Sequence, residues 1–196
     1  DDIYNSMVFD GIGYHNFVHA KPELKDRLVF VDSVSKTYGM PGWRVGLLAG
    51  PEAVAKAVTT LNSNHITSVP EVITAAAVAA LAGPQDIPQA KCAEFAERRD
   101  TVVAALNAIP GGSGPRPQGA FEAVPDISVA FGKSHKGVKI TSDVEFCAAL
   151  LEAKGVACVP GSAFGEPRAL RISYTCPAEQ LQPGLQRIQA FFAELA

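Results

Sequence analysis

The chain has 196 residues, which suffices for one large or two small domains with a sizeable core. Hydrophobic residues make up 47% and charged residues 19%, and this composition excludes a mainly disordered protein. Seventeen Lys and Arg residues against twenty Asp and Glu residues leave a net charge of -3, with no long run of one sign. The charge therefore indicates neither a nucleic acid nor an anionic lipid surface as partner.

The sequence shows no membrane span and no metal-binding pattern. No stretch approaches the ~18 consecutive apolar residues that cross a bilayer, and no basic, then apolar leader opens the chain, so we expect a soluble cytoplasmic protein. The four cysteines are dispersed without any C-x-x-C pair, and the four histidines are scattered along the chain. We therefore predict no metal site and no disulfide framework.

The first half alternates short apolar runs with helical patterns. Leu28–Val31 and Val45–Ala49 are apolar on both faces, which favours strands buried in a covered sheet. Helices are predicted from Pro51 to about Leu61 and from Pro70 to Leu81, each with proline in the first turn. This alternation predicts an α/β layer.

The second half opens with one long amphipathic helix, from about Pro88 to Ile109, which ends at a proline and glycine cluster over 110–115. A second α/β arrangement follows. Strands are predicted over 120–124, 127–131, 156–159 and 170–174, and helices over 142–154, with Ser142 as N-cap and Gly155 at the C-terminus, and over 177–195.

The domain boundary is expected at the long helix. Residues 1–90 form one α/β domain, residues 91–109 a connecting helix, and residues 110–196 a smaller α/β domain.

The residues with chemical potential lie between Val31 and Gly50. Lys36 follows a predicted strand in a loop rich in Ser, Thr and Gly, and Arg44 lies eight residues later with no carboxylate between them. Hydroxyls, glycine N–H groups and a guanidinium indicate a phosphate site. A lysine beside such a site is typical of a Schiff-base lysine, whereas the alternative is an ordinary solvated surface lysine.

Three segments resemble motifs of class I and II aminotransferases. The run S-V-S-K-T-Y-G-M-P-G-W-R-V-G, which starts at Ser33, is similar to the family's pyridoxal-phosphate attachment motif. Asp1-Asp2-Ile3-Tyr4 resembles its D-E-x-Y motif, and Arg171 in L-R-I-S-Y resembles its C-terminal arginine. The match extends from end to end of the chain and is most similar to the bacterial aspartate aminotransferase branch.

The resemblance implies a role for each residue that surrounds the cofactor ring. Lys36 corresponds to the catalytic lysine that forms the aldimine with pyridoxal 5′-phosphate and then moves a proton between Cα and C4′. Asp1 corresponds to the aspartate that pairs with the pyridinium nitrogen. Tyr4 corresponds to the tyrosine that hydrogen-bonds the 3′-oxygen.

The resemblance also implies anion-binding roles. Ser33 and Arg44 correspond to phosphate ligands, and Arg171 to the arginine that binds the substrate α-carboxylate through a two-point fork. Structural alternatives remain for four of these residues: a frayed terminal acid for Asp1, a core residue for Tyr4, a helix cap for Ser33 and a solvated strand residue for Arg171.

The implied fold is part of a pyridoxal-phosphate-dependent transferase large domain, with a mostly parallel sheet, plus a small C-terminal α/β domain. The implied activity is transfer of an amino group from aspartate or a similar amino acid to a 2-oxo acid such as 2-oxoglutarate, in a homodimer. The family's ring-stacking aromatic and glycine-rich phosphate turn have no counterpart here. We therefore expect a C-terminal portion that is inactive by itself; a lyase of the same fold and a non-catalytic binding module are the alternatives.

Overall fold

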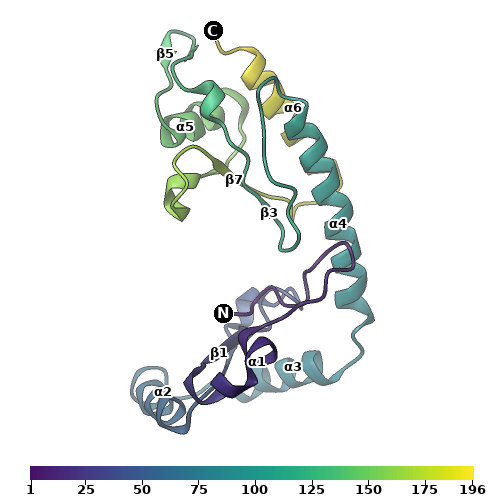
Figure 1. The fold of residues 1–196 in the computed structure, drawn as a ribbon, viewed down its shortest axis with the longest axis vertical. Helices are drawn as coiled ribbons and strands as arrows, with labels where there is room; N and C mark the ends of the chain where they lie inside the picture. The colour runs from purple at the N-terminus through teal and green to yellow at the C-terminus, as the bar shows by residue number, and fades with distance from the viewer. The chain divides into compact units, whose positions relative to one another are not determined.

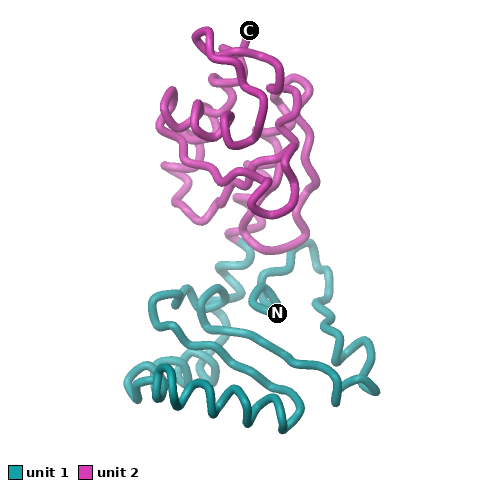
Figure 2. The backbone as a smooth tube through the Cα atoms, turned by 90° about the vertical axis from the view of Figure 1, so that its left-hand side faces the viewer, with its two compact units in different colours: residues 1–93 teal, residues 94–196 magenta.

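The computed structural model describes residues 1–196, which cluster into two compact units, Asp1–Ala93 and Glu94–Ala196 (Figure 2). Both units combine helices with small β-sheets, so the predicted α/β class is confirmed. A single helix, α4 (Asp86–Asn107), contributes residues to both units.

The first unit contains short turns, one sheet and two full helices (Figure 1). In chain order its elements are α1 (Phe17–Ala20), η1 (Pro22–Arg27), β1 (Phe30–Ser33), η2 (Pro41–Trp43), β2 (Gly46–Ala49), α2 (Glu52–His65) and α3 (Glu71–Ala82). The predicted helices and strands after residue 28 are all present, with bounds shifted by a few residues.

The sheet of this unit differs from the expectation in two respects. Strands β1 and β2 pair antiparallel, Phe30 opposite Ala49 and Ser33 opposite Gly46, whereas the resemblance implied mostly parallel pairing. No helix crosses over between them, and a parallel pair needs such a connection. The expected burial is also wrong, because all four residues of β2 are exposed. Two strands without further neighbours leave their apolar side chains uncovered.

The core of the first unit anchors the lysine loop. Val34 is fully buried and packs with Val45 and Ala77. Because Val34 lies between Ser33 and Ser35, its burial fixes the start of the turn that follows β1. The two serines that flank it remain partly buried at the surface of this core.

The second unit is built on a three-stranded antiparallel sheet in the order β3, β7, β6. After α4 its elements are β3 (Glu122–Ala123), η3 (Ser128–Ala130), β4 (Ser134–His135), β5 (Val138–Lys139), α5 (Asp143–Lys154), β6 (Val159–Pro160), η4 (Gly161–Phe164), β7 (Leu170–Ser173) and α6 (Ala178–Ala193).

The helices of the second unit close over one continuous core. Helix α5 packs against α6 and β6, and α4 contributes Val102, which is fully buried. Phe146 and Phe191 meet edge to face with 5.3 Å between their ring centroids. A core of this size indicates that the second unit holds its fold through its own contacts.

Local signals explain where the helix predictions succeed. The Ser142 Oγ accepts the backbone N–H of Glu145 at 3.2 Å, and Gly155 adopts a φ of 65° at the C-terminal end of α5. The predicted N-cap and C-terminal glycine are therefore confirmed.

One predicted strand is wrong. The strand predicted over 127–131 is absent, and Ser128–Ala130 form the 3-10 helix η3 instead, because the Asp126 carboxylate accepts the backbone N–H of Ser128 at 2.7 Å. This Asx-type turn competes with extended backbone. The strand predicted over 156–159 is displaced to Val159–Pro160.

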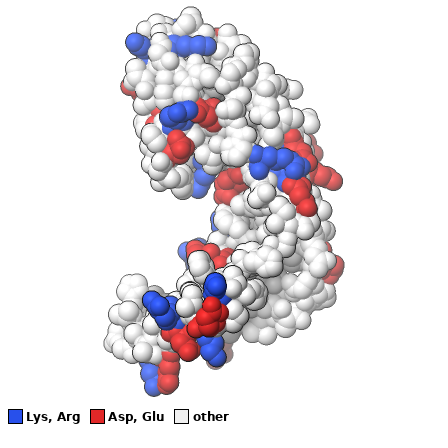
Figure 3. Space-filling view, viewed as in Figure 1, with Lys and Arg blue, Asp and Glu red and all other residues white.

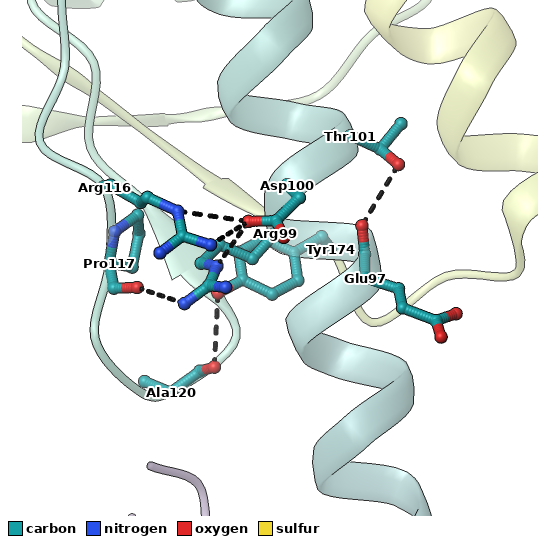
Figure 4. Close-up of polar contacts among 8 residues, drawn as sticks. All are labelled: Glu97, Arg99, Asp100, Thr101, Arg116, Pro117, Ala120 and Tyr174. Atoms are coloured by element: carbon teal, nitrogen blue, oxygen red, sulfur yellow. Dashed lines mark hydrogen bonds and ion pairs between the residues drawn. The ribbon is translucent and has the colours of Figure 1, made fainter. Parts of the chain in front are cut away.

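A buried arginine attaches the loop after α4 to that helix (Figure 4). Arg99 is 1% exposed, and its guanidinium donates to Asp100 at 2.9 Å and to the Pro117 carbonyl at 3.1 Å. Arg116 donates to the same Asp100 oxygen at 2.8 Å, and the Tyr174 hydroxyl donates to a carbonyl of this loop. The buried Arg99 charge is thus compensated by an ion pair with the half-exposed Asp100 carboxylate and by a backbone carbonyl, as burial of a charge requires.

The surface carries both charge signs. On the face drawn in Figure 3, acidic and basic side chains are interspersed among neutral residues. None of the helices is both long and apolar enough to traverse a bilayer.

Candidate functional site

The structure brings Tyr4 and Lys36 together. Lys36 lies in the turn after β1, partly buried, and its Nζ is 5.6 Å from the centroid of the Tyr4 ring. The N-terminal segment reaches this position because the Asp2 backbone N–H donates to the Val31 carbonyl of β1 at 2.8 Å. A cation over an aromatic face is attracted by the ring quadrupole. Two motifs from separate segments thus meet at one place.

Asp32 links the same two segments and was not selected from the sequence. Its Oδ2 accepts the Asn5 side-chain amide at 2.6 Å, and its Oδ1 accepts the backbone N–H of Ser33 at 2.6 Å. This carboxylate therefore ties the residue after Tyr4 to the start of the lysine motif. The available signal was an acidic residue at the end of a predicted strand, directly before that motif.

Ser33 closes a turn rather than capping a helix. Its Oγ accepts the backbone N–H of Ser35 at 3.1 Å, and residues 35–38 form a turn. A serine hydroxyl that accepts one hydrogen bond still has its own O–H to donate. Ser33 can therefore serve as a donor to an anion while it maintains the turn.

Arg44 is exposed and adopts an unusual backbone conformation. Its φ is 56° and its ψ is 45°, in the left-handed region that non-glycine residues seldom occupy. Its Nη1 donates to the Pro41 carbonyl at 2.9 Å, and no carboxylate of the chain pairs with it. The remaining guanidinium N–H groups are free to bind an anion such as phosphate.

The carboxylates of Asp1 and Asp2, at the start of the chain, differ in the hydrogen bonds that they accept. Burial and a hydrogen bond to the Asp2 carboxylate raise the pKa of Tyr14 to about 12, so Asp2 is occupied by a structural contact. Asp1 is exposed, and its Oδ1 accepts the backbone N–H of Ile3 at 3.3 Å. Asp1 is therefore the acid with acceptor capacity to spare.

Arg171 belongs to the second unit. On β7, Leu170 and Ile172 face the core, and Arg171 points to the opposite face, as the alternation predicted. Its guanidinium carbon is 4.2 Å from the centroid of the Phe164 ring. Arg171 also lines a pocket of about 620 Å³, together with Cys158, which precedes β6, and residues of β6, β7 and α6.

The donor set of the first unit fits pyridoxal phosphate. The oxygens of a phosphate dianion accept hydrogen bonds from guanidinium and hydroxyl groups, and Arg44 and Ser33 supply one of each. The aldehyde requires a primary amine, supplied by Lys36, beside a phenol, supplied by Tyr4. The basic ring nitrogen requires a carboxylate, and Asp1 is available for it.

Known proteins resemble this chain over nearly all of its length. The sequence profile of the family described as "Aminotransferase class I and II" matches residues 1–188. The "Aspartate/prephenate aminotransferase" of Cereibacter sphaeroides is 43% identical over 100% of this chain and 49% of its own length. The "Aspartate aminotransferase" of Streptomyces avermitilis is 41% identical over 99% of this chain and 48% of its own length.

The fold agrees as well. The crystal structure of the aspartate aminotransferase from Rhizobium meliloti superimposes with a TM-score of 0.96 and 40% identity, covering 100% of this chain and 49% of that one. The chain thus spans about half the length of the curated relatives it matches. With the profile matched over nearly all its residues, and with relatives and fold in agreement, this chain belongs to the class I and II aminotransferase family.

Proposed function

We propose that the protein acts as a pyridoxal-phosphate-dependent aminotransferase that moves the amino group of aspartate, or a similar amino acid, to a 2-oxo acid such as 2-oxoglutarate. The observation that carries the proposal is the pairing of the Lys36 amine with the Tyr4 ring at 5.6 Å, in a loop that also presents Ser33 and Arg44. The names of the relatives support aspartate as donor, and one of them makes prephenate a second compound to assay.

The cofactor, when bound, supplies an electron sink for the negative charge that develops at the substrate Cα. Each candidate residue of the first unit has its own role toward the cofactor. Lys36 would hold the cofactor through its side-chain amine and would move the proton between the substrate Cα and the cofactor C4′. Asp1 would keep the proton on the ring nitrogen, Tyr4 would donate to the ring oxygen, and Ser33 and Arg44 would bind the phosphate.

Arg171 binds the substrate α-carboxylate in this proposal. A guanidinium gives two parallel N–H donors to a carboxylate, which fixes the orientation of the amino acid before the proton is moved. The alternation of β7 supports this role, because it directs Arg171 away from the core while Leu170 and Ile172 anchor the strand.

The proposal further includes a cytoplasmic homodimer with domains over 1–90 and 110–196 joined by a helix over 91–109.

Borohydride reduction followed by peptide mass spectrometry tests the attachment of the cofactor. We expect the full-length protein, incubated with pyridoxal phosphate and reduced, to carry the added mass on the peptide that contains Lys36. Lys36→Ala should remove the labelled peptide and the amino transfer together, whereas Lys139→Ala, in the exposed hairpin β4–β5, should retain both. A protein that remains unlabelled, or is labelled elsewhere, would contradict the proposal.

Product analysis separates amino transfer from elimination. With aspartate and 2-oxoglutarate we expect one new amino acid and one new 2-oxo acid in equal amounts. Ammonia in place of a new amino acid would assign the lyase alternative.

A further inference from the structure

Phe164 is an exposed aromatic residue with a specific neighbour. Its side chain is 56% exposed at the end of η4, although exposure of an apolar phenylalanine ring to water is unfavourable. The Arg171 guanidinium lies over this ring, with 4.2 Å between the guanidinium carbon and the ring centroid. This distance is well within the ~6 Å range of a cation–π contact.

A buried acid holds the turn that carries Phe164. Asp143 is 3% exposed at the start of α5, and its Oδ2 accepts the backbone N–H of Ser162 at 2.7 Å. Burial by itself raises the pKa of Asp143, but hydrogen bonds from Ser162 and from the helix backbone outweigh it and lower the pKa below the usual value. The carboxylate therefore stays ionised at neutral pH and keeps its hold on η4.

The base of the same turn has no spare room. A Cβ at Gly161 would lie 2.3 Å from the Glu166 carbonyl oxygen and 2.5 Å from that of Ala169. Only glycine allows this approach of η4 to the start of β7. The turn is therefore fixed from both sides, by Asp143 and by the backbone before β7, and its aromatic residue has a defined position.

Arg171 contacts an aromatic ring and not a carboxylate, so its positive charge is not neutralised by an ion pair. No carboxylate of the chain pairs with Arg171, and the ring of its neighbour Phe164 does not neutralise the guanidinium charge. An ion pair with an acid would compete with a bound anion for the N–H donors. A contact with an aromatic ring does not occupy the guanidinium N–H donors as an ion pair does, so they stay available for a carboxylate.

We infer that Phe164 is a positioning residue for Arg171, held in place by Asp143 through Ser162. The inference rests on the proposed binding of the substrate carboxylate by Arg171. The Phe164 ring in η4 orients the Arg171 guanidinium before substrate binds, and this raises the affinity for carboxylate substrates.

Conservative variants at the exposed Phe164 test the inference without affecting the core. Phe164→Leu keeps apolar volume and loses the ring, whereas Phe164→Tyr keeps the ring. In the full-length protein we expect Phe164→Leu to raise the KM for aspartate and the dissociation constant of succinate, measured calorimetrically, about 2- to 5-fold, with kcat nearly unchanged. Phe164→Tyr should match the wild type.

A second pair of variants tests the support of η4. Asp143→Asn should weaken succinate binding in the same direction as Phe164→Leu. Asp126→Asn is the matched control, because Asp126 also accepts a backbone N–H at a 3-10 turn, that of Ser128 at 2.7 Å, in η3. We expect Asp126→Asn to bind succinate as the wild type does.

The outcomes distinguish the inference from the proposed function. If Arg171→Ala weakens succinate binding and Phe164→Leu does not, the role of Phe164 is overturned while the role of Arg171 stands. If Arg171→Ala leaves binding unchanged, the carboxylate-binding role of Arg171 is overturned, and the inference with it. Equal effects of Phe164→Leu and Phe164→Tyr would also overturn it, because only the first removes the ring.

Discussion

At the scale of one residue, Arg44 has a strained backbone conformation. Its left-handed backbone conformation, with a φ of 56°, costs a non-glycine residue roughly 1–2 kcal/mol. Glycine would adopt the same conformation without that strain. The proposed phosphate-binding role of the guanidinium would account for an arginine at this strained position.

Arg44→Gly should separate stability from binding. We expect the free energy of unfolding to stay equal or to rise by up to about 1 kcal/mol, because relief of strain is partly offset by the greater freedom of unfolded glycine. The affinity for pyridoxal phosphate should fall about tenfold or more, since a charged hydrogen bond contributes about 1.5–3 kcal/mol. Urea unfolding and cofactor titration measure the two quantities.

Lys136 provides the matched control for this variant. It also has a positive φ, 49°, in the hairpin between β4 and β5. Lys136→Gly should relieve comparable strain and leave the cofactor affinity unchanged. The phosphate role of Arg44 would be refuted by an Arg44→Gly protein that binds pyridoxal phosphate as tightly as the wild type.

At the scale of the element, helix α5 begins with reciprocal hydrogen bonds. Ser142 accepts the backbone N–H of Glu145 at 3.2 Å, and the Glu145 carboxylate in turn accepts the Thr141 backbone N–H at 2.7 Å. These bonds satisfy donors that a helix end leaves unpaired. They also set where α5 starts, and so where Asp143 meets η4.

Ser142→Ala should lower the free energy of unfolding by about 1 kcal/mol, because the N-cap acceptor is lost. Ser142→Gly should cost only a few tenths of a kcal/mol, since glycine is tolerated at this position. Urea unfolding followed by far-UV circular dichroism measures both. Equal losses for the two variants would show that the serine hydroxyl does not cap the helix in solution.

At the scale of the whole molecule, the carboxylates with lowered pKa all lie in the second unit. Hydrogen bonds or ion pairs with neighbouring groups favour the charged form of each. They are Asp100, Asp126, Asp143, Glu145 and Glu194. Because ionisation is favoured in the folded state, protonation of these groups must oppose the folding of this unit.

Acid should therefore destabilise the second unit. Each folded pKa lies below its ordinary value of 3.8 or 4.5, so the stabilisation is complete above those values and is lost as the pH falls through the folded pKa. We expect unfolding free energies that are level between about pH 7 and 5 and fall below about pH 4. Asp143→Asn should show a smaller loss between pH 5 and 3. A wild-type profile that is flat down to pH 3 would disprove this account.

Much of the fold followed from signals within a few residues. The N-cap serine, the glycine after α5 and the apolar periodicity of α4 and α6 predicted helices that the structure contains. The same reasoning failed at 127–131, where the side chain of Asp126 diverts an apolar run into a turn. A local hydrogen bond of this kind overrides β-propensity, which depends on context.

The sequence by itself determined the α/β class, the positions of the helices and, through contiguous motifs, the residues Lys36, Arg44 and Arg171 as candidates. Only the tertiary structure decided that Asp32 joins Asn5 to Ser33, and that the Arg171 guanidinium lies over the Phe164 ring. The physical reason is the separation along the sequence of the residues that interact. Caps, periodicity and motifs depend on neighbours along the chain, whereas these contacts exist only after the backbone has brought separate segments together.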